Sequence, residues 1–155
     1  MSEPLEVRVY KASKILELWE DQQLKNAFPI GIGKEEQGHK FCEGDLRTPE
    51  GEYEICVKNP KSKYYLSLGL NYPNLKDAKL ALDSRRITDE QFTAIEQAHF
   101  AKKRPPWDTQ LGGAIYIHGD LETREWSEGC IRMYKEDIEL LFNSLAIGTR
   151  VVIFP

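Results

Sequence analysis

Two short segments in the second half of the chain combine reactive side chains with glycine. His118-Gly119 directly follows the apolar run Ala-Ile-Tyr-Ile, and Cys130 comes twelve residues after His118, immediately behind Gly129. A thiol becomes an effective nucleophile when a nearby imidazole can take its proton. A polar loop separates the two segments and can fold them together. The spacing therefore predicts a Cys130–His118 pair that carries out acyl transfer.

The residues next to Cys130 suit the other requirements of that chemistry. Because Gly129 lets the backbone approach a carbonyl, we expect the N–H groups of Gly129 and Cys130 to form an oxyanion hole. Arg132 could hold a substrate carboxylate with its planar guanidinium. Ser127 belongs to the same short segment, and we place it among the substrate-binding residues.

These residue types also have ordinary structural uses. A single cysteine is often a small core residue, and a single histidine is often a hydrogen-bonded structural one. A metal site made of His39, His118 and Cys130 is a weaker alternative, because neither helical nor C-x-x-C spacing supports it. We therefore expect no metal site.

Further candidates for substrate contact lie outside the two segments. Tyr72 and Trp126 are candidates for the walls of the cleft, with packing in the core as the alternative. Lys40 could bind an acidic substrate, although lysine is also common on protein surfaces. Asp45 and Thr48 belong to a turn that contains proline and glycine, and we expect both to be scaffold.

The elements that must position these residues are mainly strands. Alternating apolar and polar residues predict a strand at 5–10, and turns then separate it from strands at 15–19 and 27–32, as in an antiparallel meander. The remaining predicted strands are 51–57 and 64–70, on either side of a turn at 59–62, followed by 114–117 and 149–154.

Helical periodicity is visible twice. A capping box formed by Thr88 and Gln91 opens the first helix, which Pro105-Pro106 is expected to stop. The second helix has apolar residues at i, i+3, i+4 and i+7 within 138–145, and Gly148 ends it. The pattern predicts a mainly β fold with two or more helices, either a sandwich or a partly closed barrel.

Length and composition restrict the class of protein. The 155 residues are enough for one domain, which we assign to residues 1–155. The net charge of -4 disfavours a general nucleic-acid binder, and 41% hydrophobic residues favour a globular chain. The apolar runs are too short for a transmembrane segment.

Of the three cysteines, Cys42 and Cys56 could form a disulfide if the protein works outside the cytoplasm. The alternative is that both are ordinary buried thiols.

The two reactive segments, taken together, resemble a known family. Ile117-His118-Gly119 followed by Ser127-Glu128-Gly129-Cys130-Ile131-Arg132 resembles the His…Ser-x-Gly-Cys signature of YkuD-type L,D-transpeptidase catalytic domains. The resemblance covers nearly the whole chain and is greatest to the YafK-like branch. It extends to Gly38-His39-Lys40, to Glu43-Gly44-Asp45-Leu46-Arg47-Thr48-Pro49-Glu50-Gly51-Glu52-Tyr53, to Asn59-Pro60, to Asn71-Tyr72-Pro73-Asn74 and to Thr109-Gln110-Leu111-Gly112-Gly113.

The resemblance implies a fold, a substrate and a reaction. The fold would be the YkuD-like sandwich or partly closed barrel, and the substrate would be the stem peptide of peptidoglycan, with a tetrapeptide as donor. Cys130 would form a thioester, His118 would be the base, and the backbone carbonyl of Gly119 would orient the imidazole. An amine acceptor would give cross-linking or exchange. Water would give carboxypeptidase or amidase activity, including release of wall-linked protein. The family requires no metal or organic cofactor.

One position departs from the family pattern and leaves alternatives open. Many relatives have histidine where this chain has Glu128, so His118 is the remaining base within the two motifs. Glu128 could be solvent-exposed, or it could discriminate among incoming amines. Two readings of another class are an inactive wall-binding module, and a redox-sensing thiol protein in which Cys42 or Cys56 resolves Cys130.

The substrate, and not the sequence, suggests where the protein works. Peptidoglycan lies outside the inner membrane, so we expect a periplasmic or other extracytoplasmic location. The first residues show no secretory signal, which a trimmed chain, a delivered toxin or a cytoplasmic enzyme would each explain. The sequence leaves the oligomeric state open.

Overall fold

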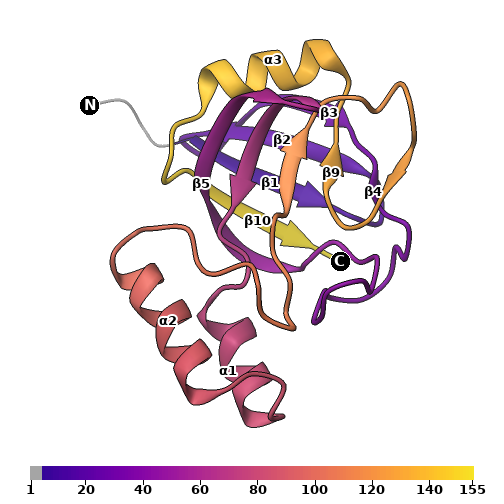
Figure 1. Cartoon of the computed structure of the whole chain (residues 1–155). Helices are drawn as coiled ribbons and strands as arrows, with labels where there is room; N and C mark the ends of the chain where they lie inside the picture. Colours follow the sequence, from indigo (N-terminus) through magenta and orange to yellow (C-terminus); the bar gives the residue numbers. More distant parts are fainter. Residues whose placement is uncertain (1–4) are drawn as a thin grey trace.

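The predicted N-terminal meander begins the sheet (Figure 1). The computed structural model describes residues 5–155, so the first four residues, where we looked for an export signal, lie outside it. Strands β1 (Leu5–Tyr10), β2 (Ile15–Glu20) and β3 (Gln23–Pro29) are antiparallel neighbours. Their alternation buries Val7 and Val9 on one face.

The remaining long strands extend this meander into one strongly curled sheet. β10 (Arg150–Phe154) pairs in parallel with β1 and antiparallel with β5 (Gly51–Ser62). β6 (Tyr65–Leu70), β7 (Tyr116–His118) and β9 (Ile131–Arg132) follow, which gives the order β3-β2-β1-β10-β5-β6-β7-β9. β4 (Ile32–Gly33) and β8 (Trp126–Ser127) form a separate parallel pair. This architecture confirms the predicted mainly β, partly closed barrel.

Helix α3 (Lys135–Ser144) lies across one end of the curled sheet (Figure 1). Its buried residues Ile138 and Leu141 lie on one helical face, as the periodicity predicts, and α3 packs against β6. Ile138 and Leu141 belong to the main core, which lies inside the curled sheet. Other residues of this core include Val7, Leu16, Ile55, Leu68, Ile117, Ile131 and Val151.

Two helices form a hairpin that projects from the opposite end of the sheet (Figure 1). α2 (Asp89–Phe100) has the predicted Thr88–Gln91 capping box, although it ends before Pro105-Pro106 is reached. α1 (Leu75–Asp83) was not predicted. Its N-cap is Asn74, which forms a second capping box with Asp77. The hairpin has a small core of its own made of Ala78, Ala81, Ile87, Ile95 and Leu111.

The predicted turn at 59–62 is wrong, because β5 continues as a strand to Ser62. The chain reverses only beyond it, where Ser62 pairs with Tyr65, after a register irregularity that follows Asn59. The described register pairs β5 with β10 up to Glu54, and Ile55 then bonds to Gly148 and Thr149; the register does not extend to Pro60. Pro60 therefore need not donate a ladder hydrogen bond on that side.

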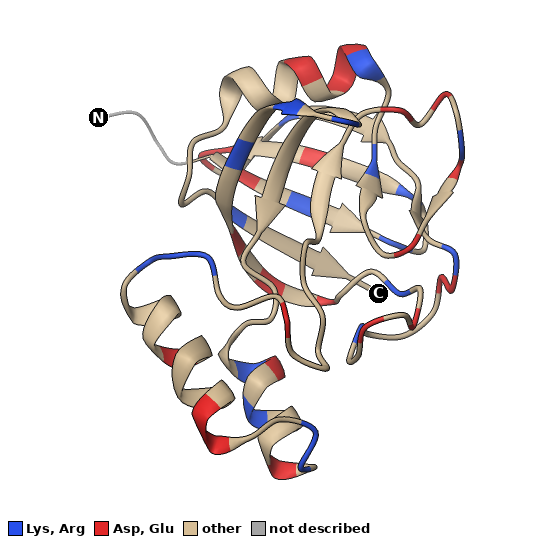
Figure 2. Cartoon of the chain, viewed as in Figure 1, with Lys and Arg blue, Asp and Glu red and all other residues tan. Residues whose placement is uncertain are grey.

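Charged residues of both signs are interspersed along the ribbon (Figure 2). On the sheet, Arg8 pairs with Glu6 and Arg150 with Glu52, each at 2.6 Å. The net negative charge is thus not confined to one element. None of the helices within residues 5–155 is long and apolar enough to cross a membrane.

Candidate active site

The parallel pairing of β7 and β9 brings the two reactive segments together. His118 is opposite Arg132 and Ile117 is opposite Ile131, so Cys130, one residue before β9, lies level with Tyr116. Because side chains alternate along a strand, His118 and Arg132 share one face while Ile117 and Ile131 enter the core. His118 and Cys130, which are twelve residues apart in the sequence, thus lie on adjacent paired segments.

The His118 ring is held in one tautomer. Its Nδ1 lies 2.7 Å from the carbonyl oxygen of Gly119. Since a carbonyl can only accept, Nδ1 carries the proton and Nε2 is left as the basic nitrogen. The ring is 2% exposed and stacks on Tyr64 with centroids 4.5 Å apart. Burial lowers the pKa of His118, which therefore rests as a neutral imidazole.

Cys130 has two backbone partners. The Tyr116 N–H donates to its Sγ at 3.4 Å, and the thiol donates to the carbonyl oxygen of Ala114 at 3.5 Å. Burial raises the pKa of the Cys130 thiol, which favours the protonated form. Within residues 5–155, no hydrogen bond joins His118 to Cys130, although both side chains face the same cavity. Such contacts commonly close only when substrate binds.

A network of hydrogen bonds fixes the loop that precedes Cys130. The Ser127 hydroxyl donates to the carbonyl oxygen of Cys130 at 2.5 Å and accepts the Gly129 N–H at 3.0 Å. The predicted oxyanion donor Gly129 is therefore already engaged by Ser127. Gly129 has a φ of 143°, and a Cβ there would lie 2.9 Å from the carbonyl oxygen of Arg47, so a side chain does not fit.

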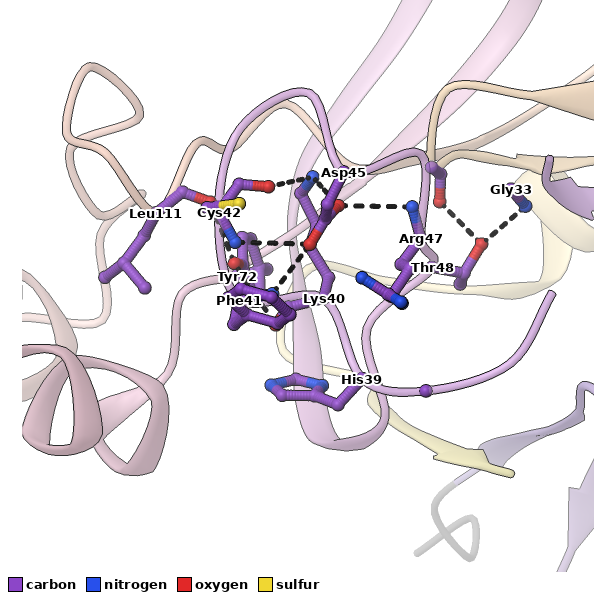
Figure 3. Close-up of polar contacts among 12 residues, drawn as sticks. Gly33, His39, Lys40, Phe41, Cys42, Asp45, Arg47, Thr48, Tyr72 and Leu111 are labelled. Carbon is purple, nitrogen blue, oxygen red and sulfur yellow. Dashed lines mark hydrogen bonds and ion pairs between the residues drawn. The ribbon is translucent and has the colours of Figure 1, made fainter. Parts of the chain in front are cut away.

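Thr48, which we expected to be scaffold, ties a distant turn to this loop (Figure 3). Its hydroxyl donates to the carbonyl oxygen of Gly129 at 2.8 Å and accepts the Gly33 N–H at 2.9 Å. Thr48 is fully buried. The turn in the first half of the chain thus supports the backbone immediately before the thiol.

Asp45 and Lys40 form a second buried group beside this turn (Figure 3). The Asp45 carboxylate accepts the backbone N–H groups of Phe41, Cys42 and Arg47 and the Lys40 ammonium. These hydrogen bonds hold the pKa of Asp45 below its ordinary value against the opposing effect of burial. Lys40 is 3% exposed and lines the cavity, with its ammonium bound to Asp45 and to the Cys42 carbonyl.

Arg132 contacts a carboxylate, and that carboxylate belongs to the chain itself. Its Nη1 donates to Asp120 Oδ1 at 2.6 Å, and the same oxygen lies 3.3 Å from His118 Nδ1. The Arg132 side chain is 4% exposed. We did not single out Asp120 from the sequence, although its place directly after His118-Gly119 was the available signal. Tyr64 was also missed.

The aromatic candidates fall in different places. Tyr72 is fully buried and its hydroxyl donates to the Leu111 carbonyl at 2.8 Å, so it packs in the core and does not wall the cavity. Trp126 is 39% exposed, and the guanidinium of Arg124 lies over its ring. Arg124 itself lines the cavity.

His39, one of the residues of the alternative metal site, has other partners in the structure. His39 accepts the Glu50 N–H at Nδ1 and contacts Asp77 through Nε2, each at 2.7 Å, away from Cys130. Residues 5–155 contain no cluster of three or more potential ligands among His, Cys, Asp and Glu. All three cysteines are free thiols, so Cys42 and Cys56 are not bonded to each other.

The cavity in front of Cys130 has a volume of about 670 Å³ and carries charge of both signs. Glu128 is exposed and lines it, which is compatible with both alternatives given for this residue. The other lining residues include Lys63, Tyr64, Tyr116, His118, Arg124, Ser127, Cys130 and Arg132.

The site therefore combines a thiol and an oriented imidazole on one cavity of a curled β sheet. Residues 4–153 match the L,D-transpeptidase catalytic domain family, YkuD. The chain belongs to this family, which confirms the resemblance seen in the motifs.

The relatives agree with that assignment. "Putative L,D-transpeptidase YafK" of Escherichia coli (strain K12) is 29% identical over 148 residues, which are 92% of this chain and 47% of the relative. The chain thus spans about half the length of the curated relatives it matches.

Solved structures show the same fold. The helical cell shape determining protein Pgp2 from Campylobacter jejuni is 25% identical with a TM-score of 0.65, covering 98% of this chain and 48% of that one. Bd1075 from Bdellovibrio bacteriovorus is 22% identical with a TM-score of 0.64, covering 99% and 48%.

Proposed function

We propose that this domain transfers an acyl group from a peptidoglycan stem peptide to an acceptor through a thioester at Cys130. The observation that carries the proposal is that Cys130 and His118, from the paired segments of β7 and β9, line one cavity, with His118 Nδ1 fixed on the Gly119 carbonyl. Membership of the L,D-transpeptidase family supports the substrate class.

The chemistry begins with proton transfer from the thiol to His118 Nε2. The Cys130 sulfur attacks the carbonyl of the third stem residue, and the C–S bond forms as the carbonyl becomes an oxyanion. The oxyanion then collapses, the C–N bond to the terminal D-amino acid breaks, and His118 returns its proton to the leaving amine.

The oxyanion needs backbone donors that lie close to the sulfur. Ser127 occupies the Gly129 N–H in the resting protein. The Tyr116 N–H already points at the sulfur, and the Cys130 N–H is adjacent to it. We assign these two amides to the oxyanion, which revises the pair expected from the sequence. Because Arg132 is held by Asp120, a substrate carboxylate would have to share its guanidinium.

The thioester can meet an amine or water. Attack by an amine of another stem gives a cross-link or an exchanged residue, and attack by water gives a shortened stem. Glu128 places an exposed carboxylate beside the cavity that could contact a cationic acceptor, while Lys63 and Arg124 bring the opposite charge to the same lining.

The test is mass spectrometry of the protein and of its products. Purified tetrapeptide muropeptides should add a tripeptide-containing acyl group to Cys130, and Cys130→Ala should show no adduct. Cys42→Ala is the matched control, because it removes another half-buried free thiol. Product masses then separate a dimer, an exchanged stem and a tripeptide. Turnover by Cys130→Ala, or a disulfide in place of an acyl adduct, would overturn the proposal.

A further inference from the structure

We propose that Asp120 is a positioning residue that balances the buried charge of Arg132, so that His118 can accept the proton of Cys130. The proposal rests on the function proposed above. Its physical core, the interaction of Asp120 with His118 and Arg132, can be measured without substrate.

One carboxylate oxygen of Asp120 serves two cationic or potentially cationic groups. Asp120 Oδ1 accepts from Arg132 Nη1 at 2.6 Å and lies 3.3 Å from His118 Nδ1. The side chains of His118 and Arg132 are 2% and 4% exposed, so water screens neither of them well. The carboxylate is therefore the counter-charge that lies between them.

The backbone at Asp120 is held in a conformation that most residues avoid. Its φ is 79°, in the left-handed region where glycine is favoured and where Asp and Asn are the best tolerated of the other residues. Such strained positions are maintained by the surrounding structure and cluster at functional sites. Aspartate tolerates this conformation, and here its carboxylate contacts both Arg132 and His118.

The charges around the imidazole explain why a counter-charge is needed. Tyr64 stacks on one face of His118, Cys130 faces the same cavity, and Arg132 and Asp120 lie at the Nδ1 side. Arg132 and burial both disfavour the imidazolium, while Asp120 and the Gly119 carbonyl favour it. When the thiol proton reaches Nε2, the new positive charge is close to a buried guanidinium. Asp120 compensates for that repulsion.

The direct experiment is an NMR titration of the three histidines in the resting protein, using labelled imidazole nitrogens. Asp120→Asn keeps the side-chain shape and tolerates the backbone conformation. It should lower the pKa of His118 by about one pH unit or more. Arg132→Met, which removes the opposing cation, should shift the same pKa upward. A packing role alone would not give opposite signs for the two variants.

The control and the kinetics complete the test. Glu52→Gln removes an arginine–carboxylate pair of the same 2.6 Å length at an exposed site and should leave the His118 titration unchanged. In Asp120→Asn, kcat/KM for thioester formation should fall by about tenfold or more, and its acidic limb should move to lower pH. Asp120→Asn/Arg132→Met should return the titration towards that of the wild type.

The outcomes separate this inference from the proposed function. An unchanged His118 titration in both single variants, with acyl transfer intact in the wild type, overturns the role of Asp120 alone. Opposite shifts without any thioester in the wild type would support the charge balance and contradict the proposed reaction. Should Asp120→Asn fail to fold, the upward shift in Arg132→Met still tests the balance, and its absence would refute it.

Discussion

At the scale of single residues, the site rests as a neutral thiol and a neutral imidazole. Burial raises the pKa of Cys130 and lowers that of His118, and the thiol donates to the Ala114 carbonyl. A preformed thiolate–imidazolium pair would require the opposite shifts. In the proposed reaction, proton transfer would therefore accompany attack on the substrate, and the sulfur would stay unreactive until a substrate is positioned.

This resting state predicts the pH dependence of Cys130 alkylation. Because the folded pKa is raised, the thiolate fraction is small at neutral pH and grows as the pH increases. The rate constant for iodoacetamide should rise about tenfold per pH unit from pH 7, without a plateau below about pH 9. Peptide mass mapping measures it, with Cys42 as internal reference. A rate that is high and flat between pH 6 and 8 would indicate an ion pair instead.

His118 has its own kinetic signature. His118→Ala should reduce kcat/KM for thioester formation by about 100-fold or more, because the base is lost. In the wild type, the acidic limb of kcat/KM should have its midpoint below about pH 6.5, the ordinary value for histidine, since burial lowers the pKa of His118. Circular dichroism checks that the variant is folded. Near-normal rates at neutral pH would assign the base to another group.

The sequence points to Cys130 and His118 as the candidate pair, but it does not point to the residues that contact them in the structure. Cys130 and His118 are recognisable because glycine and apolar strand residues flank them. Tyr64 lies 54 residues before His118, and only the pairing of β6 with β7 places it on the imidazole. Tyr72 was misplaced because an aromatic residue near a motif has the same local pattern in a core as in a cleft.

At the scale of elements, hydrogen bonds from distant loops support the backbone next to Cys130. Thr48 lies 81 residues before Gly129, and its buried hydroxyl connects the carbonyl of Gly129 to the N–H of Gly33. A threonine can do this because one hydroxyl both donates and accepts. The Gly-Asp-x-x-Thr-Pro block therefore acts on the site through backbone support.

Replacing that hydroxyl should loosen the loop. Thr48→Val keeps the shape but leaves a buried N–H and a buried carbonyl unpaired, so it should lower the free energy of unfolding by about 2 kcal/mol or more. It should also reduce the rate of thioester formation. Thr48→Ser retains both hydrogen bonds and is the matched control. Urea denaturation of the two variants measures the difference, and equal stabilities would show that the hydroxyl is dispensable.

The elements that were mispredicted have physical explanations. In α1, the bulky residues Leu75 and Leu80 are exposed, while Ala78 and Ala81 are buried against α2. Apolar periodicity therefore does not mark the buried face of that helix, and the Asn74 cap was the better signal. Pro60 suggested a turn, but β5 is an edge at that point, where a proline is tolerated.

At the scale of the whole molecule, β10 joins the two halves of the sheet. It lies between β1 and β5, with Val151 and Ile153 in the main core and Val152 on the other face. Both halves of the core therefore depend on the side chains of one short strand.

Truncating one of these side chains should destabilise the entire fold. Ile153→Ala should lower the free energy of unfolding by about 2–5 kcal/mol, as for other core isoleucines. Val152→Ala is the comparison from the same strand. Val152 is also buried but lies outside the main core cluster and loses fewer atoms, so it should cost less. Thermal unfolding followed at several wavelengths measures both. Similar losses of stability for the two variants would mean that the two faces of β10 contribute equally to the core.

The parallel pairing of β1 with β10 also imposes an order in time. During synthesis, the N-terminal meander emerges from the ribosome more than a hundred residues before the strand at 150–154 that completes its edge. Until then, β1 has an unpaired edge, and contacts so far apart in sequence form slowly. The sheet can therefore be completed only after residues 150–154 have been synthesised. Until then, the unpaired edge of β1 is open to pairing with strands of other chains.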